Sequence, residues 1–363
     1  MVKNICVDEA LKLPGVILVD VRSEGEFKEA TIPGAVNVPL LNNEERVMVG
    51  AEYRQVSVGS AKRMGLDIIS SKLPAMVRDF DDLTAQGRKV VLFCWRGGMR
   101  SQSVAHILDM MGFDVYRING GYKDYRRYVS GYLEEKLTLR AVVIHGLTGV
   151  GKTLVLKGLA ELGIPVLDLE GLAVHRGSVY GKVGLPPSPS QKLFESLIFR
   201  DLKAAEPRGL FLVECESRRL GRLSVPTSVL NAMKEGYGVL LYAPLETRVR
   251  RSLKEYVSDT GDNDSIDQIL AATGLLKRYL GQKKVELLSR WITEGQIEEA
   301  VKLLLVEYYD PLYKYPDRTD SGYDLSVDTM DIDLAVDQIY RFVKCLPEYN
   351  LQVDGGERDG YRE

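Results

Sequence analysis

Residues 146–153 read GLTGVGKT, which is a complete G-x-x-x-x-G-K-T signature. The apolar run LRAVVI (139–144) precedes it, and LVLKGLAELG (154–163), which has helical periodicity, follows it. A strand, a glycine-rich loop and a helix in this order are typical of a P-loop. The alternative, a glycine turn closing an ordinary helix, fits this context less well. The sequence therefore predicts that a ligand carrying a diphosphate or triphosphate binds here.

The residue types in this loop match the chemistry of a phosphate chain. Glycines let the backbone turn tightly enough to direct several N–H groups at phosphate oxygens, and the following helix adds the positive end of its dipole. Lysine supplies a point charge, and the threonine hydroxyl is a ligand for Mg²⁺. We expect the diphosphate to contact Gly146, Thr148, Gly149, Val150, Gly151, Lys152 and Thr153.

Length and composition place the chain among ordinary globular proteins. Its 363 residues suffice for two domains, and 45% of them are hydrophobic and 27% are charged. The net charge is −3. No global positive field therefore indicates nucleic-acid binding, and a nucleic-acid partner would need a local basic patch.

The cysteines and the apolar runs argue against several other classes. The four cysteines (6, 94, 215 and 345) include no C-x-x-C pair, which argues against a disulfide framework and a zinc site. No apolar run is long enough for a membrane span, and the start MVKNICVDEA lacks the apolar core of a signal peptide. We therefore expect a cytoplasmic protein with no membrane partner.

A cysteine ends another predicted strand, KVVLF (89–93), and begins the loop CWRGGMRS (94–101), which leads into a helical segment. Such a loop directs backbone N–H groups and a helix dipole at the sulfur, which favours a thiolate and tetrahedral anionic substituents on it. The alternative is a buried structural cysteine, the usual fate of a lone cysteine. The Gly-Gly pair and two arginines favour an anion loop with a catalytic Cys94, formed with Trp95, Arg96, Gly97, Gly98, Met99 and Arg100.

This first third of the chain resembles the rhodanese family. The resemblance rests on VDVR (19–22), the IPGA turn (32–35), the Cys-X5-Arg loop (94–100) and GGY (120–122). It implies a cysteine that carries a transferred sulfur as a persulfide, although the same skeleton also supports a phosphatase. Thr31 replaces the histidine that usually precedes the turn in this family, where its role is mostly structural.

Alternating strands and helices around the P-loop predict a doubly wound parallel sheet, with its ligand at the carboxyl edge. Glu214 ends the strand GLFLVE (209–214), a place where a carboxylate commonly holds Mg²⁺ directly or through water. Asp168 and Glu216 are weaker candidates. A solvated or salt-bridged face explains these acids equally well.

Three basic or polar residues of this half could clamp the diphosphate. Arginine presents a planar fork to phosphate oxygens, and His175 lies in the segment HRGSVYG (175–181). A structural histidine explains His175 equally well. The candidates are His175, Arg176 and Arg218.

The predicted fold class is α/β, with an N-terminal rhodanese-like α/β domain followed by a P-loop domain that has a doubly wound parallel sheet and a helical C-terminal part. We expect YYDPLY (308–313) in that last part to form a turn. The predicted segments are a rhodanese-like domain at 1–121, a helical connector at 122–138, a P-loop α/β domain at 139–262, the helical part at 263–348 and a disordered tail at 349–363.

Two regions could contact RNA. Tyr122, Tyr125, Tyr128 and Tyr132 fall at helical spacing beside three basic residues of the connector. They predict either a packed helix face or, less readily, a nucleic-acid contact. The basic pairs at 277–278 and 283–284 could bind the RNA backbone, or they could belong to a solvated helix face.

A rhodanese-like half placed ahead of a P-loop half resembles the tRNA 2-selenouridine synthase family, over about residues 16–313. The matching segments are CWRGGMRS (94–101), GGYKDYRR (120–127), GLTGVGKT (146–153), HRGSVYG (175–181) and ESR (216–218). The resemblance implies a two-step change at the wobble uridine of a tRNA anticodon stem-loop. Geranyl diphosphate first alkylates the 2-thio group, and selenium from selenophosphate then displaces the S-geranyl group.

The resemblance implies different tasks for the two loops. The P-loop, with Mg²⁺ as its expected cofactor, would stabilise the departing diphosphate. The Cys94 loop would receive selenophosphate, and its thiol would either take the selenium or assist the displacement. An enzyme that supplies selenophosphate is a further expected partner. Two other classes stay open: a sulfurtransferase or phosphatase domain fused to an ATP-dependent small-molecule kinase, and a non-catalytic nucleotide-sensing module.

Overall fold

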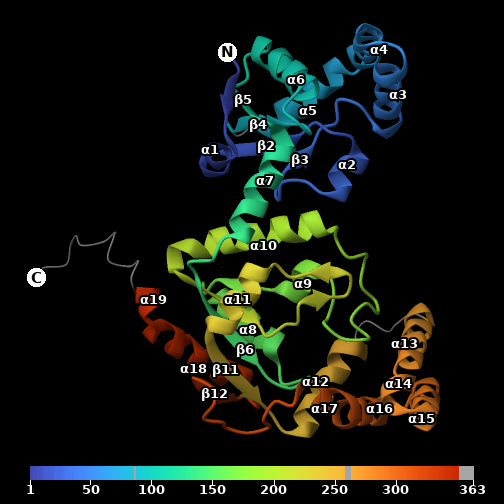
Figure 1. Cartoon of the computed structure of the whole chain (residues 1–363), viewed down its shortest axis with the longest axis vertical. Coiled ribbons are helices and arrows are strands. Elements are labelled where there is room, and N and C mark those ends of the chain that lie inside the picture. Colours follow the sequence, from blue (N-terminus) through green and yellow to red (C-terminus); the bar gives the residue numbers. More distant parts are fainter. Residues whose placement is uncertain (86, 258–262, 351–363) are drawn as a thin grey trace, which may run out of the picture. The chain divides into compact units, whose positions relative to one another are not determined.

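The computed structural model describes residues 1–85, 87–257 and 263–350 (Figure 1). All of the predicted disordered tail except its first two residues lies outside this range. The chain divides into two compact units. Unit 1 comprises Met1–Tyr132 and Pro189–Leu197, and unit 2 comprises Leu133–Ser188 and Ile198–Glu363.

Unit 1 is built on a parallel sheet of order β1-β5-β4-β2-β3. Strand β4 lies at its centre, which explains why its residues 90–93 (VVLF) are all apolar, since both faces of a central parallel strand are covered. The end of β4 brings Cys94 to the carboxyl edge of the sheet. The strands are β1 (Lys3–Ile5), β2 (Val16–Asp20), β3 (Val36–Asn37), β4 (Lys89–Phe93) and β5 (Val115–Ile118).

Helices surround this sheet and bury one continuous core, in which Phe80, Leu92 and Leu108 are fully buried. Between residues 42 and 85 the chain is almost entirely helical. The helices are α1 (Val7–Lys12), α2 (Glu24–Glu29), α3 (Asn43–Gln55), α4 (Val58–Ser70), α5 (Leu73–Thr84), α6 (Met99–Met110) and α7 (Gly121–Glu134).

Helix α7 occupies most of the predicted connector. Tyr122 and Tyr125 are each 1% exposed, and Val129 is fully buried, so the side chains of this face are packed inside the protein. Arg126 donates hydrogen bonds to the Lys192 carbonyl and to the Ser196 hydroxyl, at 2.9 and 3.0 Å. The packed-face interpretation is therefore confirmed for the buried tyrosines.

Unit 2 is built on a second parallel sheet, of order β12-β11-β6-β8-β7. From β6 the chain goes to the edge strand β7, returns to β8 beside β6, and then crosses to β11 and β12 on the other side. The carboxyl ends of β6 and β8 therefore lie at the topological switch point at which such sheets bind ligands. The strands are β6 (Arg140–His145), β7 (Val166–Leu167), β8 (Leu210–Glu214), β11 (Tyr237–Tyr242) and β12 (Leu325–Asp328).

Helices α8 and α18 pack on one face of this sheet, where Leu159 and Ile339 share a core with Ile144 (Figure 1). The helices are α8 (Lys152–Glu161), α9 (Leu169–Ala173), α10 (Gln191–Ala205), α11 (Thr227–Glu235), α12 (Leu245–Val257), α13 (Asn263–Leu275), α14 (Lys277–Leu280), α15 (Gln282–Thr293), α16 (Ile297–Leu304), α17 (Asp310–Tyr313), α18 (Ile332–Cys345) and α19 (Pro347–Asn350). A short hairpin joins β9 (Arg219–Leu220) to β10 (Leu223–Ser224).

Two features of the C-terminal part differ from the sequence prediction. The predicted turn at 308–313 is wrong, because a π-helical stretch, Leu305–Tyr309, leads directly into α17. Pro311 lies in the first turn of α17, where a missing N–H costs nothing. The predicted helical part also contains β12, which pairs in parallel with β11.

Candidate functional site

Cys94 lies directly after β4, and its side chain is 3% exposed. Its sulfur lies 3.2 Å from the hydroxyl of Ser101, one of the first residues of α6. Ser101 is fully buried, and its hydroxyl also donates a hydrogen bond to the Gly98 carbonyl at 3.3 Å. Sequence analysis missed Ser101 as a partner of the thiol, although its place directly after the Cys-X5-Arg loop could have indicated it.

The GGY segment fixes the shape of the cysteine loop. The Tyr122 N–H donates a hydrogen bond to the Cys94 carbonyl at 2.8 Å. A Cβ on Gly121 would lie 2.2 Å from that same carbonyl oxygen, and a Cβ on Gly97 would lie 2.8 Å from the Ile118 carbonyl oxygen. Gly97 and Gly121 also have φ of +61° and +62°. Two backbone segments therefore touch at positions where only glycine fits.

Arg100 points from the cysteine loop to an acidic partner that sequence analysis missed. Its Nη1 lies 2.6 Å from Oε2 of Glu26 in α2. Burial alone would raise the pKa of Glu26, but the hydrogen bond and charge of Arg100 lower it below its usual range. Burial works against the Arg100 charge, and the Glu26 hydrogen bond together with the nearby Cys94 raises the pKa of Arg100. Arg100 is therefore charged and held beside the thiol.

The remaining predicted residues of this loop lie on its outer side. Trp95 is half-buried, with its ring centroid 5.8 Å from that of Tyr122. Arg96, Gly98 and Met99 are exposed. The loop thus combines a buried sulfur with an accessible rim.

Thr31 takes a structural place in unit 1. It is 9% exposed, and its hydroxyl donates a hydrogen bond to Oδ2 of Asp20 at 2.9 Å. Asp20 also forms a buried ion pair with Arg22, at 2.6 Å. The residue that replaces the usual histidine therefore supports the buried ion pair beneath the turn.

The P-loop residues adopt the geometry that the signature predicts. Gly146, Gly149 and Gly151 have φ of +145°, +81° and +97°, a region that favours glycine. A Cβ on Gly146 would lie 2.4 Å from the Leu241 carbonyl oxygen. Lys152 begins α8, and its ammonium donates to the Gly146 carbonyl at 3.3 Å, across the mouth of the loop.

Two arginines of α12 hold this loop from outside. Arg248 Nε donates to the Thr148 carbonyl, and Arg251 Nη1 donates to the Val150 carbonyl, each at 2.8 Å. Arg248 is 3% exposed and is itself paired with Asp310 of α17. Because these carbonyls are bonded on the outside, the loop can direct its N–H groups inward. The basic pattern of α12 was visible in the sequence, but its contact with the P-loop was not.

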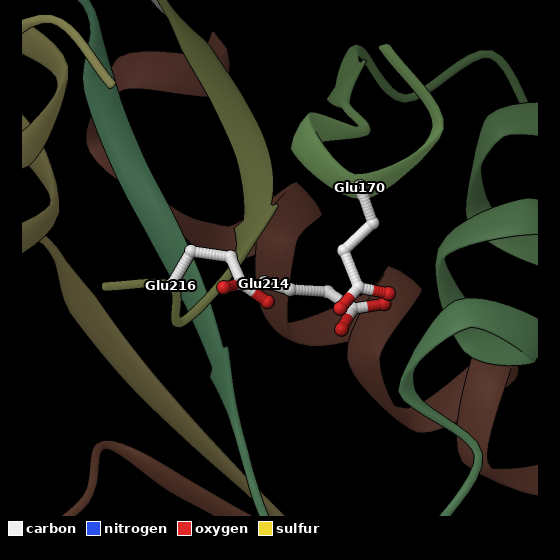
Figure 2. Close-up of side chains that lie close together, drawn as sticks. All are labelled: Glu170, Glu214 and Glu216. Carbon is white, nitrogen blue, oxygen red and sulfur yellow. The ribbon is translucent and has the colours of Figure 1, made fainter. Parts of the chain in front are cut away.

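Three carboxylates meet beside the P-loop. Glu214 ends β8, Glu216 follows it by two residues, and Glu170 lies in α9; one ligand oxygen of each falls within 4.8 Å of the others. Figure 2 shows the three side chains pointing toward one another. Thr153 Oγ1 donates a hydrogen bond to Glu214 Oε1 at 2.9 Å. The predicted pair Thr153 and Glu214 is therefore brought together, and Glu170 is an addition that the sequence did not indicate.

The three carboxylates repel one another. Burial, followed by the negative charge of Glu214, raises the pKa of both Glu170 and Glu216. Lys152 acts in the opposite direction on both. A carboxylate group of this kind holds a proton or a cation.

The other predicted residues of this half lie as follows. Asp168 caps α9, because its Oδ1 accepts a hydrogen bond from the Gly171 N–H at 2.8 Å. The His175 Nδ1 accepts one from the Gly177 N–H at 3.0 Å, and burial lowers the pKa of this histidine. Arg176 Nη1 donates to the Val183 carbonyl at 3.4 Å, and Arg218 is exposed. Diphosphate contacts by His175, Arg176 and Arg218 stay predictions.

The basic pairs proposed for RNA lie in two helices of unit 2. Lys277 and Arg278 are exposed in α14. Lys284 in α15 pairs with Glu307 at 2.9 Å, which reduces the positive charge of that pair. An RNA contact there stays a prediction.

Comparison with known proteins agrees with both halves of the fold. Residues 139–328 match the family described as tRNA 2-selenouridine synthase AAA domain, and residues 6–128 match the family described as Rhodanese-like domain. A tRNA 2-selenouridine synthase from Hydrogenovibrio crunogenus is 33% identical over 333 residues, covering 85% of this chain and 91% of the relative. One from Pseudomonas syringae pv. tomato is 34% identical over 342 residues, covering 87% and 92%. The chain belongs to the tRNA 2-selenouridine synthase family.

The predicted fold class is confirmed for this member of the tRNA 2-selenouridine synthase family. A rhodanese-like domain precedes a P-loop-type parallel-sheet domain, as the two family matches and the two sheets show. Within the described residues, no helix combines the length and the apolar character needed to cross a bilayer.

Proposed function

We propose that this protein converts 2-thiouridine at the wobble position of tRNA to 2-selenouridine, with geranyl diphosphate and selenophosphate as the other substrates. The observation that carries the proposal is one chain with two separate glycine-containing loops at strand ends, one holding a thiol and one a lysine. Family membership supports the selenation of tRNA uridine, and the two other substrates are part of the proposal.

The first step is alkylation at the P-loop. The sulfur of 2-thiouridine attacks the first carbon of the geranyl chain, and the carbon–oxygen bond breaks with its electron pair going to diphosphate. The uridine N3 proton is released, so that the S-geranyl base is neutral. Lys152 and the N–H groups at the start of α8 bind the charge that accumulates on the departing diphosphate.

The oxygen donors beside the P-loop fit Mg²⁺. The Thr153 hydroxyl and the Glu214 carboxylate would hold the ion, with Glu170 and Glu216 completing the oxygen donors. Three mutually repelling carboxylates are consistent with such a cation. Bound there, Mg²⁺ supplies charge neutralisation for the diphosphate.

The second step is displacement at the cysteine loop. Selenium of selenophosphate attacks C2 of the base, geranyl thiol leaves, and water cleaves the selenium–phosphorus bond to release phosphate. Arg100 and the start of α6 bind the phosphate portion, and the Cys94 thiol donates its proton to the departing geranyl thiolate.

A reconstitution experiment tests this proposal. tRNA containing 2-thiouridine is incubated with the protein, Mg²⁺ and geranyl diphosphate, then with selenophosphate, and its nucleosides are analysed by mass spectrometry. We expect S-geranyl-2-thiouridine first and 2-selenouridine second. ATP consumption that depends on a small molecule, with the nucleosides unchanged, would instead support the kinase alternative.

A further inference from the structure

Four side chains that the proposed steps do not use meet where β6 and β8 end. His145 is the last residue of β6 and precedes Gly146, and Cys215 follows β8 directly. The His145 ring centroid lies 5.6 Å from that of Tyr315 and 5.3 Å from that of Tyr323. Tyr315 and Cys215 are close enough for each to affect the pKa of the other. We call these residues the aromatic cluster.

The aromatic cluster is uncharged, polarizable and partly open to solvent. All four side chains are half-buried. Burial, reinforced by the charge of Lys152, lowers the pKa of His145 to about 4, so its ring is uncharged at neutral pH. Its Nδ1 is buried and has no hydrogen-bond partner among the described residues. These residues therefore present ring faces and a sulfur, with no formal charge.

The aromatic cluster lies beside the P-loop. Lys152 is close enough to lower the pKa of both His145 and Cys215, although burial raises that of Cys215 overall. His145 of the aromatic cluster directly precedes Gly146, the first residue of the P-loop. The Gly146 carbonyl accepts a hydrogen bond from the Lys152 ammonium. A ligand whose diphosphate lies on the P-loop can therefore extend an attached group onto these rings.

The side chains of the aromatic cluster limit which group attached to the diphosphate they can bind. Charged groups need counter-charges, which the aromatic cluster does not supply. A hydrocarbon is stabilised by contact with aromatic and thiol groups. Ring faces also attract the positive charge that develops on an allylic carbon as its bond to diphosphate lengthens.

We propose that the aromatic cluster binds the unsaturated hydrocarbon chain of an allylic diphosphate whose diphosphate group lies on the P-loop. This inference rests on the proposed function and adds the place of the hydrocarbon chain and the residues that select it.

Calorimetric titration of the full chain with Mg²⁺ and three probes tests the inference. The probes are inorganic pyrophosphate, geranyl diphosphate and ADP. We expect the wild type to bind geranyl diphosphate at least about tenfold more tightly than pyrophosphate. Tyr323→Ala should reduce this preference to less than about threefold with pyrophosphate affinity unchanged, and Tyr323→Phe should keep it. Tyr279→Ala, which removes an exposed ring in α14, is the matched control.

Two results of the titration overturn the inference in different ways. If Tyr323→Ala keeps the wild-type preference for geranyl diphosphate, or loses affinity for ADP instead, the aromatic cluster does not hold the hydrocarbon and the proposed function is untouched. If the wild type binds neither pyrophosphate nor geranyl diphosphate, the proposed function fails and the inference fails with it.

A second measurement does not depend on the folding of the tyrosine variants. In a protein with Cys6, Cys94 and Cys345 replaced by serine, Cys215 is the remaining thiol. Saturating geranyl diphosphate should slow its alkylation by iodoacetamide at least about tenfold, and pyrophosphate less than about threefold. Equal slowing by the two ligands overturns the inference.

Discussion

Thr153 donates its hydroxyl hydrogen to Oε1 of Glu214 over 2.9 Å, and this bond joins the P-loop to the end of β8. The two residues are 61 positions apart in sequence. Because Glu170 and Glu216 lie against Glu214, the bond places the P-loop and the three carboxylates side by side. The charge balance of that site determines how it responds to a cation.

Glu170→Gln should stabilise the metal-free protein and remove its response to Mg²⁺. The substitution keeps the size of the side chain and removes a carboxyl group whose pKa is raised by burial and by the repulsion of Glu214 and Glu216. We expect a gain of about 1 kcal/mol, or roughly 2–4 °C in the midpoint of thermal unfolding of unit 2. Glu161→Gln on the exposed side of α8 is the control. A variant that is stabilised by Mg²⁺ as much as the wild type would exclude Glu170 from the cation site.

Lys152→Ala should weaken pyrophosphate binding by about 10- to 100-fold, because a hydrogen bond to a charged group contributes about 1.5–3 kcal/mol. Lys157→Ala on the same helix removes an exposed lysine and should change the affinity little. Titration calorimetry of both variants measures the difference. Equal affinities for the two variants would show that Lys152 does not contact the ligand.

Gly121→Ala should destabilise unit 1 by more than about 2 kcal/mol, since its Cβ would lie 2.2 Å from the Cys94 carbonyl oxygen and its φ is +62°. Gly131→Ala in the same helix meets open space and should stabilise by up to about 1 kcal/mol. Urea unfolding followed by Trp95 fluorescence, with Trp291→Phe in all proteins, reports on unit 1. Similar urea midpoints for the two variants would mean that Gly121 does not lie tightly against the Cys94 carbonyl.

His145 should make unit 2 sensitive to acid. Its pKa is about 4 in the folded chain and about 6.5 when unfolded, so the unfolded chain binds more protons between these values. Stability should therefore fall as the pH decreases from 7 to 5, by at most about 2 kcal/mol from this residue. His145→Phe should lose this component, whereas His106→Gln, which replaces an exposed histidine, should keep it. If wild type and His145→Phe lose the same stability, the ring is not held uncharged by its surroundings.

Local sequence patterns are sufficient to predict much of the fold and both loops. The apolar runs before Cys94 and Gly146 are central strands with both faces covered, so their sequences carry a strong signal. The glycines of GLTGVGKT occupy backbone conformations that favour glycine, which makes the loop recognisable without any long-range contact.

Long-range pairing explains what sequence analysis missed. Strand β12 is four residues long and half polar, LSVD, and only its pairing with β11 identifies it. Glu170 of α9 and Glu214 of β8 lie far apart in the sequence and come together only in the folded chain. Glu26 and Arg100 form an ion pair although 74 positions separate them. Tyr315 and Tyr323 reach His145 from more than 160 positions away. No spacing rule in the sequence predicts such contacts.

The division of work between the two loops is the central claim, and nucleoside mass spectrometry of complete reactions tests it most directly. Reactions with wild type, Cys94→Ala and Lys152→Ala contain the same tRNA, Mg²⁺, geranyl diphosphate and selenophosphate, with Cys345→Ala as the cysteine control. We predict 2-selenouridine from wild type and control, S-geranyl-2-thiouridine that accumulates with Cys94→Ala, and unchanged 2-thiouridine with Lys152→Ala. Wild-type yields of 2-selenouridine from Cys94→Ala, or of the S-geranyl intermediate from Lys152→Ala, would contradict it.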